Sequence, residues 1–133
     1  MELVFLLLIL FQIKHFICDY PLQTPYMLGK MGRTNWIKPL AAHAGIHAIG
    51  TFIIVYVFIH TAYWLDNLVF ATAFALVDFT LHFIVDRIKA SPDLGGRWKP
   101  NQPYFWWALG ADQMAHHLFN YLFVFLIFTL GVN

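Results

Sequence analysis

Four apolar stretches, each long enough to cross a lipid bilayer as a helix, alternate with short polar segments along this chain. A transmembrane helix needs about 20 mostly apolar residues. Of the 133 residues, 60% are hydrophobic and 11% are charged, and a soluble globule of this size has too little interior to hide so much apolar surface. The sequence therefore predicts an all-α, polytopic membrane protein, a bundle of four transmembrane helices in a single domain, 1–133. The predicted spans are 3–20, 37–61, 67–90 and 104–132.

The segments between the predicted spans are rich in proline, glycine and polar residues. Residues 21–36 are expected to form a short amphipathic segment in the membrane interface, 61–66 a tight turn and 91–103 a polar loop. Glu2 precedes the first apolar stretch where a signal peptide has basic residues, and 13–20 offers no small-residue cleavage site. The first apolar stretch is therefore expected to stay in the protein as a span.

The basic residues indicate how the chain lies in the membrane. Four spans place both termini on one side and the segments 21–36 and 91–103 on the other. All eight basic residues lie in or near these two segments, so the positive-inside rule assigns them to the cytoplasm and both termini to the outside of an inner (cytoplasmic) membrane. The net charge of +1 gives no bias towards nucleic acid, and no such partner is expected. The eight residues are Lys14, Lys30, Arg33, Lys38, Arg87, Lys89, Arg97 and Lys99.

Each predicted span carries a pair of polar residues spaced i, i+4, which places two side chains on one face of a helix. The direction of each span puts all four pairs in the cytoplasmic half of the membrane. They sort into two layers one helical turn apart, with Asp78 one turn deeper than either. The outer layer contains Asp19, His43, Asp86 and Asp112, and the inner layer contains His15, His47, His82 and His116.

These eight paired residues predict a metal site. Ionisable residues cost about 2.5 to 3.5 kcal/mol each inside a membrane, so their presence requires a function. Imidazoles and carboxylates that converge inside a four-helix bundle are the usual ligands of bundle metal centres. The set favours a divalent transition metal, with zinc first and iron or manganese as alternatives. Eight ligands exceed the four of one tetrahedral zinc, so we expect two ions, or one ion with supporting hydrogen bonds.

The competing interpretation is that the polar residues only join the helices by hydrogen bonds. Serine, threonine or asparagine would do this at a lower cost, and such residues would have no reason to gather in one half of the membrane. Three other residues are given modest roles. Cys18 is expected to be a small packing residue, His60 an interfacial residue without a role in the site, and His117 either a supporting residue or a lipid-facing one.

Four motifs carry a resemblance to a known family. They are HxxxD at 15–19, HxxxH at 43–47, HxxxD at 82–86 and DQxxH at 112–116. The chain resembles an uncharacterised family of small four-helix integral-membrane proteins of bacteria and phages, classed as a domain of unknown function. The resemblance supports the fold and the site but brings no established activity. By looser analogy, the chain is similar to membrane-bound metal-dependent hydrolases of the bacterial damage response.

The function that these features favour is a metal-dependent hydrolase acting on an amphiphilic substrate, with a phosphate or an ester, at the cytoplasmic face. A metal-bound water would be the nucleophile, and Asp78 or Asp112 would act as general base or orient a histidine. Three alternatives stay open: a redox protein with haem or a di-iron centre, an ion or proton carrier with Asp78 in a relay, and a structural membrane protein with a stabilising metal. A carrier with four spans would need to form a homo-oligomer. The lipid bilayer is the one partner common to all these hypotheses.

Overall fold

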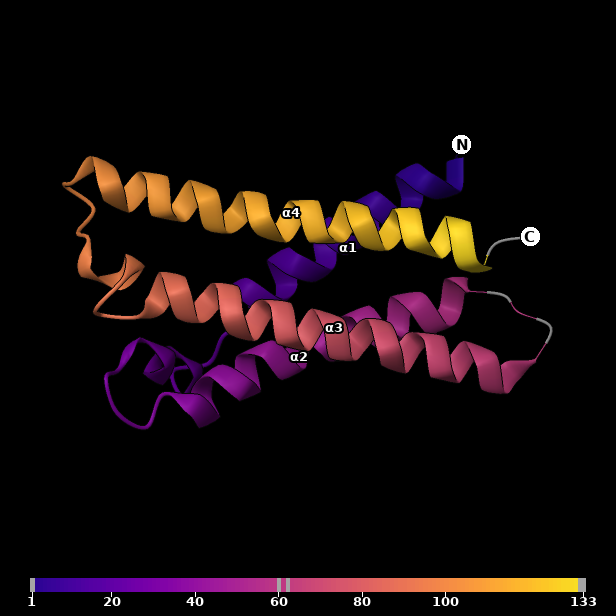
Figure 1. Cartoon of the computed structure of the whole chain (residues 1–133), viewed down its shortest axis with the longest axis horizontal. Coiled ribbons are helices and arrows are strands. Elements are labelled where there is room, and N and C mark those ends of the chain that lie inside the picture. Colours follow the sequence, from indigo (N-terminus) through magenta and orange to yellow (C-terminus); the bar gives the residue numbers. More distant parts are fainter. Residues whose placement is uncertain (1, 60, 62, 132–133) are drawn as a thin grey trace.

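The architecture is a bundle of four long helices. A computed structural model of the chain describes residues 2–59, 61 and 63–131, with side chains up to Thr129. No strand occurs in the described part of the chain. The start of α1 and the end of α4 lie at one end of the bundle, and the connections after α1 and after α3 lie at the other (Figure 1). The elements are α1 (Glu2–Asp19), η1 (Met27–Met31), α2 (Ile37–Phe58), α3 (Trp64–Ala90), η2 (Gly95–Arg97) and α4 (Pro103–Gly131), the two η elements being short 3-10 helices.

The helices agree with the predicted spans to within a few residues at their ends. Helix α2 ends at Phe58, before the predicted end at residue 61, because Ile59 has extended backbone. Helix α3 begins at Trp64, before the predicted start at Asn67, and the Asn67 side chain accepts a hydrogen bond from the backbone N–H of Thr61 in the preceding turn. The predicted end of the fourth span, at residue 132, and the interpretation of His60 lie outside the described residues.

Two stretches of the chain are long and apolar enough to cross a membrane, judged by length and composition alone. One is α2, Ile37–Phe58, and the other is Trp64–Arg97, which contains α3. Only 39% and 22% of their most apolar windows are buried inside the molecule, so most of this apolar surface is not covered by the rest of the chain. For α1 and α4 the transmembrane assignment stays a prediction.

The interior changes from apolar to polar along the bundle axis. At the end nearer the termini, all four helices contribute to one apolar core, in which Phe123 of α4 packs against Phe11 of α1 and Phe74 of α3. Towards the opposite end, histidines, aspartates and lysines are buried beside a few apolar side chains such as Leu40 and Ala44. The apolar core thus holds the four helices together and sets the rotation that turns their polar faces inward. Its buried members are Leu7, Phe11, Val55, Ile59, Ala71, Phe74, Phe123, Val124 and Ile127.

Candidate metal centre

All eight predicted ligands come together between the helices. They form three groups, and in each group one ligand atom per residue lies within 4.8 Å of the others. Atoms that bind one zinc ion at about 2.1 Å lie about 3 to 4 Å from one another, so small side-chain rotations would bring each group to bonding distance. His47 belongs to two of the groups and connects them. The groups are His15, His47 and His82; Asp19, His43 and His47; and Asp86, Asp112 and His116.

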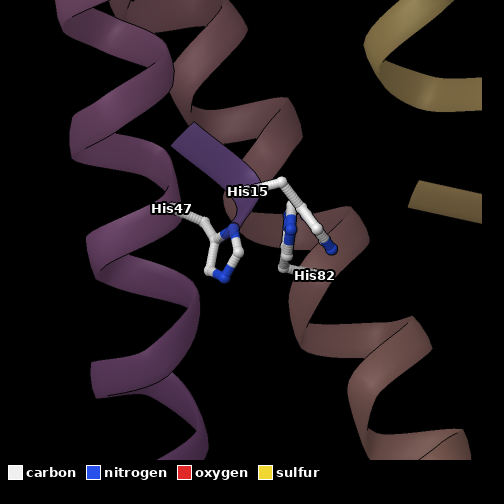
Figure 2. A group of neighbouring side chains, drawn as sticks. All are labelled: His15, His47 and His82. Carbon is white, nitrogen blue, oxygen red and sulfur yellow. The ribbon is translucent and has the colours of Figure 1, made fainter. Parts of the chain in front are cut away.

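The four histidines of the predicted inner layer do meet. His15 of α1, His47 of α2 and His82 of α3 point into one space between their helices (Figure 2). The ring centroids of His47 and His82 are 3.8 Å apart, and His15 is 5.3 Å from His47. His116 of α4 completes the set, with its ring 4.4 Å from His82 and 5.0 Å from His15. Each helix therefore supplies one imidazole to a single buried cluster.

Two of these histidines have a ring orientation fixed by the backbone of their own helix. His82 Nδ1–H donates to the carbonyl oxygen of Asp78 at 3.1 Å, and His116 Nδ1–H donates to that of Asp112 at 2.9 Å. A carbonyl oxygen only accepts, so Nδ1 carries a proton, and in the neutral form of each ring Nε2 has the lone pair. Both Nε2 atoms are buried and have no hydrogen-bond partner among the described residues. A buried acceptor of this kind is costly unless a donor or a metal ion meets it.

The carboxylate of Asp19 lies among three histidines. Its Oδ2 is 3.1 Å from His15 Nε2, and its Oδ1 is 3.2 Å from His47 Nε2 and 3.4 Å from His43 Nε2. His43 Nε2 is also 2.9 Å from Asp86 Oδ2. Asp19 thus connects the two predicted layers across α1 and α2, and His43 lies between Asp19 and Asp86 of α3. A metal ion bound at this place would have the same three nitrogens and the same carboxylate around it.

Two lysines bind the remaining carboxylates from the loop end of the bundle. Lys30 Nζ lies 3.2 Å from Asp86 Oδ2, and Lys89 Nζ lies 2.9 Å from Asp112 Oδ2. Arg87 donates a hydrogen bond to the backbone carbonyl of Lys30 and so fixes the segment that carries it. Sequence analysis treated these lysines only as markers of topology. The i, i+3 spacing of Asp86 and Lys89 placed them on one helix face, but no sequence signal connected Lys30 with the site.

Asp78 lies outside the three groups, behind the cluster. Its Oδ2 is 3.0 Å from Lys14 Nζ, and Thr51 accepts from Lys14 at 3.0 Å and donates to Asp78 Oδ2 at 2.8 Å. Its Oδ1 is 3.1 Å from His82 Nδ1, so Asp78 helps to hold that ring in place. Lys14 is only 7% exposed and Lys30 only 8%, so two of the eight residues used to assign the cytoplasmic side are buried. The predicted role of Asp78 as a general base stays a prediction, and its contacts favour the orienting role.

Gly50 provides the space through which Lys14 passes between α1 and α2. A Cβ at position 50 would lie 2.6 Å from Lys14 Cγ and 2.9 Å from its Cδ, in the middle of the side chain. Any larger residue would therefore force Lys14 away from Asp78 and Thr51. The ion pair depends on this glycine, which the sequence pattern alone did not distinguish from other small residues of the same helix.

The remaining residues singled out in the sequence lie at the margin of the cluster. Cys18 is buried, and its thiol donates to the carbonyl oxygen of Ile46 at 3.6 Å, in keeping with a packing role. His117 is half-buried, with its ring centroid 6.0 Å from that of His15, and it borders a hollow with Leu8 and Tyr121. Neither residue belongs to the three ligand groups.

The arrangement defines a class: an all-helical bundle protein with a candidate His/Asp metal centre in its interior. A family model described as "Protein of unknown function (DUF3307)" matches residues 6–133, and the chain belongs to that family. The match covers all eight predicted ligands and confirms the resemblance seen in the four motifs. No curated protein and no solved structure matches the chain.

Proposed function

We propose that this chain is an integral membrane protein that holds one or two divalent metal ions among its four helices and hydrolyses a phosphate or carboxylic ester of an amphiphile at the cytoplasmic face. The observation that carries the proposal is the pair of buried, unpartnered Nε2 atoms of His82 and His116. A cluster that served only to join helices would pair its nitrogens with donors on neighbouring helices. Here the two rings belong to two of the candidate ligand groups, His82 with His15 and His47, and His116 with Asp86 and Asp112.

The outer surface of the bundle supports a membrane location for all four helices. Large apolar side chains are exposed on each of them, for example Phe5, Ile49, Val69 and Phe125. Apolar surface of this extent on a protein requires lipid or another protein to cover it. We propose that lipid covers it, in an inner membrane, with the α1–α2 and α3–α4 connections in the cytoplasm.

The donors of the cluster suit zinc best, with iron or manganese as alternatives. A divalent ion held there supplies a Lewis acid that polarises a phosphoryl or carbonyl oxygen. Asp112 and Asp78 each have a buried Oδ1 without a hydrogen-bond partner among the described residues, but of the two only Asp112 belongs to a ligand group, so it is the aspartate to which we assign the acceptance of a proton from water. The oxygen of that water bonds to phosphorus or to the carbonyl carbon, the bond to the alcohol oxygen breaks, and the proton passes to the departing alcohol. Asp78 holds the His82 ring.

Hydrolysis by the purified protein is the direct test. We expect the zinc-loaded protein in detergent to release alcohol from a long-chain phosphate or carboxylic ester, to stop when a chelator removes zinc, and to recover when zinc is restored. Asp112→Asn should lower the rate by about 10²- to 10⁴-fold, the usual contribution of a general base. The matched control is Asp93→Asn, because Asp93 is an exposed loop aspartate that pairs with Arg33 at the surface. Metal-loaded protein that cleaves neither kind of ester would contradict the hydrolase, and bound iron with a redox-active absorption band would favour the redox alternative.

The membrane topology can be measured separately from the chemistry. A reporter active only in the cytoplasm should work when inserted in the loop near Asp93 and fail when fused after Asn133. The physical reason is the basic residues that remain at the loop end, among them Arg33, Arg87 and Lys99. A reporter that works after Asn133 and fails near Asp93 would reverse the orientation, and one that works at both places would contradict the crossing of the membrane by α4.

A further inference from the structure

Two adjoining hollows lie beside the Asp86, Asp112 and His116 group. The first, of about 410 Å³, is at the loop end of the bundle, and Lys30, Lys89, Gln23 and Trp98 are among the residues that line it. The second, of about 280 Å³, lies between α3 and α4, and Val85, Ile88, Ala111 and Ala115 are among its lining residues. Lys89, Gly95 and Ala108 line both, so the two hollows adjoin.

The first hollow has two lysine side chains in its wall. Lys30 and Lys89 line it, and each now pairs with an Oδ2 atom of the ligand group, Lys30 with Asp86 and Lys89 with Asp112. A divalent ion in that group would compete with both ammonium groups for the same carboxylate oxygens. Metal binding would therefore leave two lysine ammonium groups beside the hollow without a carboxylate of their own, which is the environment that an anion requires.

The second hollow is apolar and open to the outside of the bundle. Ala108, Ala111 and Ala115 recur at the i, i+3, i+7 positions of one face of α4, and their small side chains give the groove its depth. Ala111 is exposed, so the groove is accessible from the region that we assign to lipid. Asp112 forms part of its wall, is only 5% exposed, and has an Oδ1 with no hydrogen-bond partner among the described residues.

We infer that these hollows bind a phosphate-bearing amphiphile, with the phosphate between Lys30 and Lys89 and the hydrocarbon chain in the groove between α3 and α4. The bond joining headgroup and chain would then lie near Lys89, which lines both hollows and pairs with Asp112 in the wall of the groove. The inference deepens the proposed function by naming its substrate class, and as a reaction it rests on that function. As a binding site it is independent of turnover. A free phosphate would fill only the first hollow, and a cationic amphiphile would meet like charge there.

The test measures binding of dodecylphosphonate, whose carbon–phosphorus bond resists hydrolysis, to the zinc-loaded protein in dodecyl maltoside. Inorganic phosphate and dodecyltrimethylammonium are the comparison ligands. Ala111→Phe should fill the groove and weaken dodecylphosphonate binding at least tenfold while leaving phosphate binding within about twofold. The matched control is Ala73→Phe, because Ala73 is also an exposed helical alanine and lines neither hollow. Lys89→Gln should weaken both anionic ligands about 10- to 100-fold, the usual loss for a charged hydrogen bond.

Several results would overturn the inference. They are dodecylphosphonate binding unchanged in Ala111→Phe, tighter binding of the cationic amphiphile, or inorganic phosphate that binds as well as the phosphonate. Ala111→Phe keeps the test decisive even where Lys89→Gln loses metal or fold, since Ala111 pairs with no charged residue. If the phosphonate binds as expected but no long-chain phosphate is cleaved, the hydrolase proposal is contradicted and the binding site is supported. If a long-chain phosphate is cleaved and Ala111→Phe does not change the rate, the binding site is contradicted and the hydrolase proposal is not.

Discussion

Changing both His43 and His47 to alanine is expected to empty the centre of at least one tightly held transition metal. The two histidines lie on one face of α2 with ring centroids 4.8 Å apart, a spacing at which both side chains of one helix can coordinate the same ion. His47 is also shared by two of the three ligand groups, and His43 Nε2 lies near both Asp19 and Asp86. Removing both rings therefore removes both imidazoles that α2 contributes to the ligand groups. Elemental analysis of protein purified gently from membranes measures the loss.

The control for this experiment is His117→Ala, because His117 is a helical histidine at the margin of the cluster and outside the three groups. It should keep its metal. Wild-type protein that is fully folded and free of metal after gentle purification would refute the site. A finer comparison uses α3: Asp86→Ala should lose metal, whereas Asp78→Asn should keep it with affinity or activity reduced about 10- to 100-fold. The opposite order would favour the proton relay, in which Asp78 is the essential carrier.

Lys14→Met is expected to lower the free energy of unfolding by about 3 to 5 kcal/mol, the usual cost of breaking a buried ion pair from one side. The substitution leaves the carboxylate of Asp78, which is 0% exposed, without its ammonium partner. Thr51 can still donate to Asp78, but one hydroxyl does not neutralise a charge. The double variant Lys14→Met with Asp78→Asn should recover most of the loss, because it removes both charges and keeps an oxygen facing His82. Unfolding in detergent, followed by circular dichroism, gives the three free energies.

A surface ion pair supplies the matched control. Arg33 and Asp93 lie 2.7 Å apart, with side chains 69% and 63% exposed, so Arg33→Met should cost less than about 1 kcal/mol. If Lys14→Met is as mild as Arg33→Met, water reaches the Lys14–Asp78 pair and the interior is wetter than its packing indicates. If the double variant is as unstable as the single one, Lys14 stabilises the bundle through its packing over Gly50 and not through its charge.

The convergence of the eight ligands could be predicted because it depends on local geometry. An i, i+4 pair fixes two side chains on one helix face, and the direction of each span fixes the end at which they lie. Those two facts placed His15, His47, His82 and His116 together before any contact was known. The apolar length of the spans likewise gave the four helices to within a few residues. Helix ends were less accurate, because short caps such as the extended Ile59 decide them.

The pairings across the bundle could not be predicted because they depend on how each helix is tilted and rotated. The partners Lys30 and Asp86 are 56 residues apart in the sequence, and no local pattern connects them. Tilt also disturbs the simple layers: His116, assigned to the inner layer, shares a group with Asp86 and Asp112 of the outer one. In Figure 1, α1 crosses the direction of α4 and does not run parallel to it, which shifts the depth of its side chains relative to its neighbours.

The Lys14–Asp78 contact also sets an order of events during synthesis. Its two partners are 64 residues apart in the sequence. At about 5 to 20 residues per second, Lys14 is therefore synthesised about 3 to 13 s before Asp78. In the proposed arrangement the Lys14 ammonium of α1 lacks its Asp78 partner during this interval. We expect the newborn helix to wait at the bilayer surface or beside the insertion machinery, and to take its final depth only when α3 arrives. The candidate metal centre is then complete only when α4, the last helix to be made, has been inserted.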